Sequence, residues 1–142
     1  MQNVSFHAGE IERVPLPEAR VDVIISNCVI NLAPDKRAGY REAFRVLKPG
    51  GRLAISDVVA TAPPPEAMRN DLTWWSSCIT GAVMAEEIRT MLAGIGYEKV
   101  AVDLDEGSRD VIREWLPDRG LEGYVASVRI RATKRETDRG RT

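Results

Sequence analysis

The distribution of apolar residues predicts a buried strand at residues 21–26, around which the rest of the chain is organised. A nearly continuous apolar run is typical of a strand that is covered on both faces, as in a parallel sheet between helices. The run consists of Val21, Val23, Ile24 and Ile25.

Small polar residues follow this strand at once, namely Ser26, Asn27 and Cys28. In open α/β sheets, ligands bind just beyond the carboxyl ends of the strands, which makes these residues candidates for a site. A turn in which Ser26 and Asn27 satisfy backbone groups, with Cys28 as a small core residue, explains the pattern equally well. The local sequence leaves both interpretations open.

A helix and a second buried strand follow. Tyr40, Phe44 and Leu47 recur at helical spacing, and Pro34 can occupy the first helical position, where its missing N–H costs nothing. Residues 48–51 read Lys-Pro-Gly-Gly and end the helix, after which residues 52–59 form the strand. Strand, helix and strand in this order predict a right-handed parallel βαβ unit. Asp57, at the end of the second strand, is expected to cap a helix or hold a turn.

The remaining elements are shorter. We expect a strand at residues 4–8, a connection at residues 9–20, helices at 66–78 and 85–93, a strand at 97–104 and a short helix capped by Ser108. Residues 124–132 alternate apolar and polar positions, which predicts an outer, antiparallel strand with one solvated face. Residues 1–132 are therefore predicted to form a single domain, and the polar residues 133–142 a disordered tail.

Charge and composition exclude several classes of function. The net charge of −1 gives no electrostatic case for binding nucleic acid or an anionic membrane. The apolar stretches are much shorter than the roughly 20 residues that span a bilayer, and residues 1–10 do not resemble a signal peptide. We therefore expect a cytoplasmic protein with both cysteines reduced. The single histidine, His7, leaves little from which to build a histidine metal site.

Three short motifs stand out in the sequence: Ser-Asn-Cys-Val-Ile-Asn-Leu at 26–32, Cys-Ile-Thr-Gly-Ala at 78–82 and Leu-Lys-Pro-Gly-Gly at 47–51. Together they resemble the arsenite methyltransferases, which are class I S-adenosylmethionine-dependent enzymes. The first two motifs are the most specific, and the third is shared more widely. The likeness extends from about residue 4 to residue 134. It implies an α/β fold: an incomplete Rossmann-like class I methyltransferase sheet, mostly parallel, with an antiparallel C-terminal strand and helices on both faces.

The chain departs from this family at the cofactor site. It has no G-x-G-x-x-G motif, so the N-terminal part that cradles the methionine portion of S-adenosylmethionine and binds its ribose is lacking. By resemblance, the remaining cofactor contacts are Gly9, Glu10 and Ile11 beside the adenine, with Ser26 and Asn27 at the strand end. This half-site implies an inactive isolated chain, so its status as an enzyme stays open.

The resemblance also assigns a role to the two cysteines. In the family, cysteine thiolates hold trivalent arsenic while its lone pair attacks the methyl group, which makes Cys28 and Cys78 the expected arsenic ligands and catalytic residues. Soft ions favour thiolate sulfur, which agrees with this role. Two alternatives remain. One is a methyltransferase for a small organic substrate, with incidental cysteines, and the other is a non-catalytic module that binds arsenic or a partner through its thiols.

The missing strands have a consequence for assembly. In the family, the strand that matches residues 21–26 is central, so one of its flanks is unpaired here, and such an edge invites pairing with another strand. Residues 4–8 could fold across the gap, or two chains could associate, with or without exchange of residues 4–8. We expect a homodimer that buries Val21, Val23 and Ile25, or else a separate chain that supplies the missing half.

Overall fold

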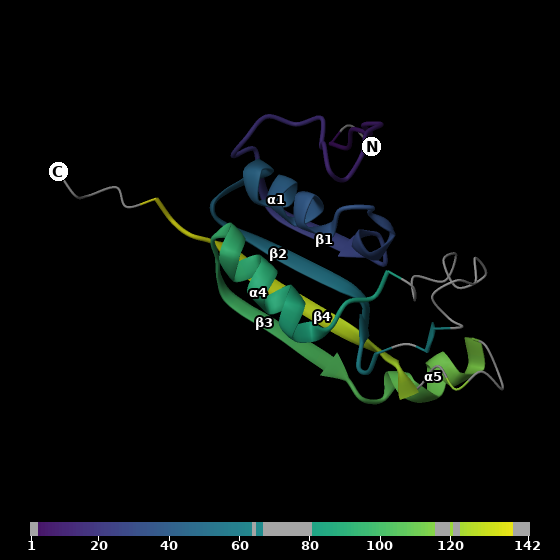
Figure 1. Ribbon diagram of the computed structural model, residues 1–142. Helices are drawn as coiled ribbons and strands as arrows, with labels where there is room; N and C mark the ends of the chain where they lie inside the picture. The colour runs from purple at the N-terminus through teal and green to yellow at the C-terminus, as the bar shows by residue number, and fades with distance from the viewer. Residues whose placement is uncertain (1–2, 64, 67–80, 116–119, 121–122, 138–142) are drawn as a thin grey trace.

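The computed structural model describes residues 3–63, 65–66, 81–115, 120 and 123–137, which build a four-stranded sheet with helices (Figure 1). The strand order is β1-β2-β4-β3. Strand β1 (Val21–Asn27) runs parallel to β2 (Leu47–Ala60), while β4 (Val125–Lys134) lies antiparallel to both β2 and β3 (Tyr97–Asp105). The predicted βαβ unit and the antiparallel last strand are thus confirmed.

Two predictions about strand position are wrong. Strand β4 is not an outer strand, because it lies between β2 and β3, although its alternation does place Ala126, Val128 and Ile130 in the core. Strand β1 is not buried on both faces either, because it forms one edge of the sheet and Ile25 is 82% exposed. Within the described residues, nothing pairs with its outer flank or covers the face that carries Ile25.

Helix α1 (Lys36–Val46) connects β1 to β2 and begins two residues after Pro34, which was predicted as its first residue. Asp35, and not Pro34, determines its start, because the Asp35 carboxylate accepts the N–H of Ala38 at 3.0 Å. At its other end, the ammonium of Lys134 donates to the carbonyls of Phe44 and Leu47 at 2.7 and 2.8 Å. Residues 133 and 134 therefore belong to β4 and not to the predicted tail, whose residues 138–142 lie outside the described part.

Helix α4 (Ala85–Ile95) lies beside α1 on the same face of the sheet, and the main core is between these helices and the strands (Figure 1). Gly96 ends α4 with a φ of 122°, a conformation that favours glycine. The Phe44 and Tyr97 rings meet edge to face with their centroids 5.0 Å apart. The fully buried side chains of this core include Tyr40, Leu47, Leu53, Ile88, Leu92, Val59, Val128 and Ile130.

Helix α5 (Ser108–Trp115) packs on the opposite face, at the carboxyl end of β2. Ile112 contacts Val58 and Val125, whose positions alternate with those that face α1 and α4. The Ser108 hydroxyl donates to the carbonyl of Asp105 at 2.6 Å and accepts the N–H of Ser127 at 3.0 Å. Helices thus lie on both faces of the sheet, as predicted.

The predicted strand at residues 4–8 is wrong. The segment forms no strand, and Phe6 and Val4 are 95% and 50% exposed. Alternation of apolar side chains is insufficient here because a strand also requires a pairing partner. Of the predicted helix at 66–78, almost everything, including Cys78, lies outside the described residues. No helix in the described part of the chain is both long and apolar enough to span a membrane.

Candidate functional site

The carboxyl ends of β1 and β2 meet at Cys28, directly after β1. The Cys28 N–H donates to the carbonyl of Ser56 at 2.9 Å, which continues the pairing of the two strands by one residue. Its φ is 52°, in the left-handed region that residues other than glycine seldom adopt. Such backbone outliers cluster at functional sites. The half-buried Cys28 side chain packs, together with Ala82 and Tyr124, against the buried cluster of Val58, Ile112 and Val125.

A buried polar network beside Cys28 fixes the next turn of chain, the short helix η1 (Ile30–Leu32). Asp57 is 3% exposed, and its carboxylate accepts the N–H of Asn31 at 3.3 Å and that of Val58 at 2.9 Å. The Asn31 amide in turn donates to the carbonyl of Val58 at 2.5 Å. The prediction that Asp57 caps a helix or holds a turn is confirmed, because it binds η1 to the end of β2.

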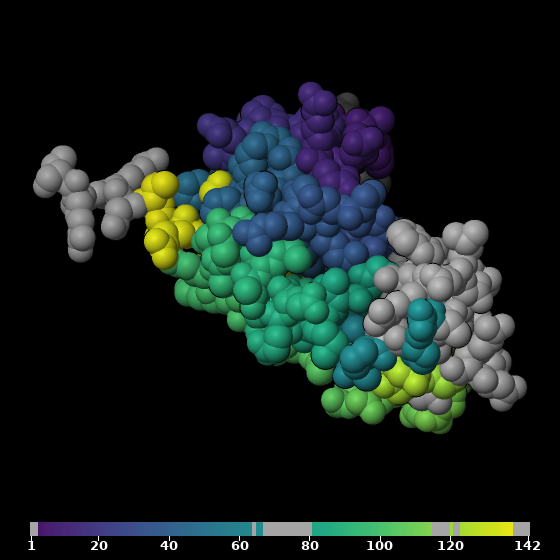
Figure 2. All heavy atoms as spheres, in the orientation of Figure 1, coloured from purple at the N-terminus to yellow at the C-terminus, as the bar shows by residue number. Residues whose placement is uncertain are grey.

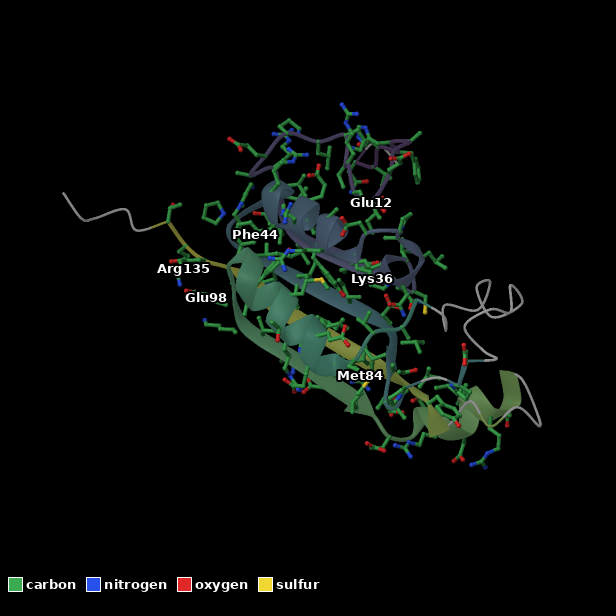
Figure 3. All side chains as sticks on the ribbon, viewed as in Figure 1. Glu12, Lys36, Phe44, Met84, Glu98 and Arg135 are labelled. Carbon is green, nitrogen blue, oxygen red and sulfur yellow. The ribbon has the colours of Figure 1, made fainter. Side chains whose placement is uncertain are left out.

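Lys36, in the first turn of α1, brings a positive charge to this network (Figure 3). Its ammonium donates to the carbonyl of Asn31 at 3.2 Å. Burial lowers the pKa of Lys36, and the nearby Asp57 carboxylate opposes this shift. Burial also raises the pKa of Asp57, and this effect outweighs the two N–H donors and the Lys36 charge. The pKa of Tyr40 is raised as well, first by burial and then by Asp57.

Gly81 lies directly against this network. An added Cβ at this position would lie 2.1 Å from the carbonyl oxygen of Asn31 and 3.2 Å from the ammonium of Lys36. Only glycine allows the chain to pass so close to η1. Sequence reasoning missed Lys36 and Gly81 as site residues. The one available signal was that Asn31 and Gly81 both fall in the motifs that carry the family resemblance.

Of the five predicted cofactor residues, the structure brings Ile11 and Ser26 together. Both line a groove of about 300 Å³ along the open flank of β1, hereafter the β1 groove. Gly9, Glu10 and Asn27 are not part of its lining. Glu10 lies in a turn, where its carbonyl accepts the N–H of Arg13 at 3.0 Å. The lining is almost entirely apolar, and the volume is at the lower limit of ligand pockets, so these residues fit only a part of S-adenosylmethionine.

The two predicted arsenic ligands can be placed only in part. Cys28 lies at the strand ends, as expected, whereas Cys78 lies outside the described residues. Among the residues that the structure describes, no three His, Cys, Asp or Glu side chains are grouped closely enough to hold a metal ion.

A family model described as a methyltransferase domain matches residues 1–96, and the chain therefore belongs to the methyltransferase domain family. Within that class, the chain is similar to arsenite methyltransferases. It is 42% identical over 137 residues to the arsenite methyltransferase of Halobacterium salinarum, a match that covers 96% of this chain and 35% of that protein. The human arsenite methyltransferase is 42% identical over 100 residues, which cover 67% of this chain and 26% of that protein.

A solved structure supports the same assignment. The crystal structure of an arsenic(III) S-adenosylmethionine methyltransferase from Chlamydomonas reinhardtii matches with a TM-score of 0.64 and 28% identity, covering 92% of this chain and 44% of that one. The family resemblance and the class I methyltransferase fold that the motifs predicted are thus confirmed. The chain nevertheless spans only about a third, or less, of the length of these two curated relatives.

Proposed function

We propose that this chain is the arsenic-binding part of an S-adenosylmethionine-dependent methyltransferase, with Cys28 and Cys78 as thiolate ligands of trivalent arsenic. The observation that carries the proposal is the placement of Cys28. A left-handed backbone at the joined ends of β1 and β2 fixes this cysteine where ligands bind in α/β sheets. The similarity to arsenite methyltransferases over 96% of the chain supports arsenic as the substrate.

The surrounding residues suit a reaction that depends on position. When bound, S-adenosylmethionine supplies an electrophilic methyl group. A nucleophile with a lone pair, such as trivalent arsenic, needs no general base. In agreement, Asp57 carries the one buried carboxylate among the described residues, and it already accepts hydrogen bonds from backbone N–H groups. The task left to the protein is to hold the reactants in line, for which effective molarities of about 10⁵ M or more are known. The network of Asp57, Asn31 and Lys36 fixes the turn that follows Cys28.

The second thiol is tethered close to this site by the covalent chain. Cys78 precedes Gly81 by three residues, and Gly81 lies against the carbonyl of Asn31. Three residues span at most about 11 Å between Cα atoms, whatever their conformation. This limit supports a shared site for Cys28 and Cys78.

The cofactor contacts of the isolated chain are incomplete. Ile11 and Ser26 are proposed to meet an apolar part of the cofactor in the β1 groove, and Gly9, Glu10 and Asn27 remain predictions. Because the sequence shows neither the Gly-rich turn that would cradle the methionine part of the cofactor nor the acidic partner of its ribose, we expect weak or undetectable S-adenosylmethionine binding by this chain alone. A micromolar dissociation constant in calorimetry would overturn this expectation.

The arsenic site is tested by titration with phenylarsine oxide, which binds pairs of thiols. One equivalent should consume both thiols, and Cys28→Ser and Cys78→Ser should each abolish tight binding while far-UV circular dichroism stays unchanged. Thr133→Cys in the Cys28→Ser background is a matched control, because it restores the number of thiols at the opposite end of the sheet, where Thr133 pairs with Arg52. If it restores tight binding, or if the two native thiols titrate independently, the shared site is wrong. Transfer of a labelled methyl group then separates an enzyme from a module that only binds arsenic.

A further inference from the structure

A second cavity lies at the end of the sheet opposite to the candidate site, where β2 and β3 begin and β4 ends. It has a volume of about 630 Å³ and is hereafter called the β4 cavity. Figure 2 shows this end of β4 in yellow, far from α5. The charged side chains of its lining are those of Glu98, Glu136, Arg52, Lys99, Lys134 and Arg135. Basic groups thus outnumber carboxylates two to one here, although the whole chain has a net charge of −1.

Strand pairing brings three residues of the lining into one row. Arg52 on β2 pairs with Thr133 on β4, and Thr133 in turn pairs with Glu98 on β3. Directly paired residues point to the same face of a sheet, so the Thr133 hydroxyl lies between the side chains of Arg52 and Glu98. Their neighbours Leu53 and Ala132 point into the core below α1 and α4. The row therefore forms a polar floor on the face that these two helices do not cover.

A bulge in β3 turns Lys99 out of the core and toward this cavity. The register between β3 and β4 shifts between Glu98 and Ala101, and Lys99 has a φ of 51°, which residues other than glycine seldom adopt. In a regular strand, Lys99 would follow the buried Tyr97 into the core. The extra residue of the bulge leaves Lys99 exposed and returns Val102 to the core. Bulges re-aim side chains beside functional sites, and backbone outliers cluster there.

The basic side chains of the β4 cavity differ in how they are engaged. Arg135 forms an ion pair with Glu98 at 2.7 Å, and the two side chains lie together in Figure 3. The ammonium of Lys134 donates to the carbonyls at the end of α1. Arg52 and Lys99 form no ion pair or side-chain hydrogen bond with the residues that the structure describes. These two cations are therefore available to a ligand.

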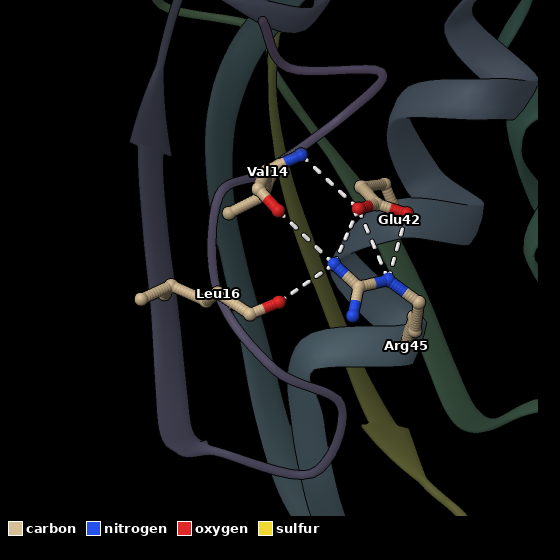
Figure 4. A network of polar contacts seen from close by, with 4 residues as sticks. All are labelled: Val14, Leu16, Glu42 and Arg45. Carbon is tan, nitrogen blue, oxygen red and sulfur yellow. Dashed lines mark hydrogen bonds and ion pairs between the residues drawn. The ribbon is translucent and has the colours of Figure 1, made fainter. Parts of the chain in front are cut away.

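Arg45 shows the contacts of a guanidinium that has a structural role in this protein (Figure 4). It donates to the carbonyls of Val14 and Leu16 at 3.0 and 2.8 Å and forms an ion pair with Glu42 at 2.6 Å. These contacts hold the segment of residues 14–16 on α1. Arg52 is exposed and makes no such contacts within the described part of the chain, so its replacement should leave the fold intact.

We propose that the β4 cavity binds a phosphate-type dianion between Arg52 and Lys99, above the hydroxyl of Thr133. Because β4 separates β2 from β3, these two strands lie about 10 Å apart, a span that long basic side chains close from both sides. Arginine presents paired N–H donors that match phosphate oxygens, lysine adds a point charge, and the threonine hydroxyl donates a further hydrogen bond. The volume admits either a free phosphate or the phosphate group of a small organic ester.

Calorimetric titration of the full chain with inorganic pyrophosphate, at constant ionic strength, tests the site and should show saturable binding. Lys99→Met and Arg52→Met should each raise the dissociation constant at least about 10-fold, which corresponds to about 1.4 kcal/mol. Arg41→Met is the matched control, because Arg41 is an exposed cation on α1 outside the lining, and it should leave the dissociation constant unchanged.

Glu136 provides a change of the opposite sign. Its carboxylate oxygen would lie 3.2 Å from a Cβ added at Gly50, and it forms no ion pair within the described residues. This negative charge in the lining opposes an anion, so Glu136→Gln should lower the dissociation constant for pyrophosphate. A variant that merely disturbed the fold would not bind more tightly, and a higher dissociation constant in Glu136→Gln would overturn the proposal.

Lys99→Gly separates binding from stability. Glycine adopts the φ of this position without strain, so the variant should raise the melting temperature of the chain alone. Pyrophosphate should raise the melting temperature of the wild type but not that of Lys99→Gly. Tighter binding of adenosine monophosphate than of inorganic phosphate would assign the cavity to an organic phosphate, and equal binding would assign it to the free anion. No saturable binding of pyrophosphate, or an equal loss in Arg41→Met and Lys99→Met, would refute the assignment.

Discussion

Removal of the Asp57 carboxylate provides the sharpest test of how the site is held together. In Asp57→Ala, the N–H groups of Asn31 and Val58 lose their acceptor in a region that is closed to water. A buried donor without a partner costs about 1–3 kcal/mol. The variant no longer buries a carboxylate, and the desolvation that is avoided offsets part of this cost. We therefore expect a loss of about 2–4 kcal/mol in the free energy of unfolding.

Urea denaturation followed by circular dichroism measures this loss. With a slope of about 2 kcal/mol per molar urea for a chain of this size, the midpoint should fall by about 1–2 M. Asp57→Asn keeps one acceptor oxygen and should lose about half as much. Asp103→Ala is the matched control, because its exposed ion pair with Arg131 at 2.8 Å is worth less than about 1 kcal/mol. Equal midpoints for Asp57→Ala and Asp103→Ala would refute the reasoning.

Three further outcomes follow from the same contacts. Burial raises the pKa of Asp57 above its ordinary 3.8, so the folded state binds a proton at this carboxyl more tightly than the unfolded state does. The stabilisation that this proton contributes is complete below about pH 3.8 and is lost as the pH rises through the folded-state pKa. Wild-type stability relative to Asp57→Asn should therefore fall with rising pH in urea titrations. Lys134→Met should cost about 1–2 kcal/mol, because the end of α1 loses the two hydrogen bonds that the Lys134 ammonium donates, whereas the exposed Lys48→Met should cost less than about 1 kcal/mol in the same assay. Gly81→Ala should lower the melting temperature, since its Cβ meets the Asn31 carbonyl, while Gly123→Ala, with no atom within 4 Å, should not.

The sequence was sufficient for features that depend on local pattern. The apolar run of β1 and the change to Ser26, Asn27 and Cys28 located the strand end, and the alternation of β4 identified its buried face and its antiparallel direction. Alternation reports which side chains face the core, and this is the same for an edge strand and for an inner strand with one solvated face. The position of β4 between β2 and β3 therefore could not be read from it.

The polar network of the candidate site also could not be predicted from the sequence, because it depends on contacts between distant residues. Asn31 and Asp57 are 26 residues apart in the sequence, and their contact depends on how β2 passes η1. Lys36, in the first turn of an amphipathic helix, has the sequence pattern of an ordinary surface lysine. The strand predicted at residues 4–8 was wrong for a different reason: the alternating pattern was present, but the described part of the chain offers it no strand to pair with.

The inner position of β4 determines the order in which the strands can join the sheet during folding. β4 follows the other described strands in the sequence, yet β3 pairs with no other strand in the described part of the chain. Leu53 must pair with Ala132, and Tyr97 with Lys134, before β3 can be joined to β2 through β4. Pairings between residues so far apart in sequence form slowly. During synthesis, β4 must therefore leave the ribosome before β3 can join the sheet, and until then the apolar face of β3 stays open to chaperones and proteases.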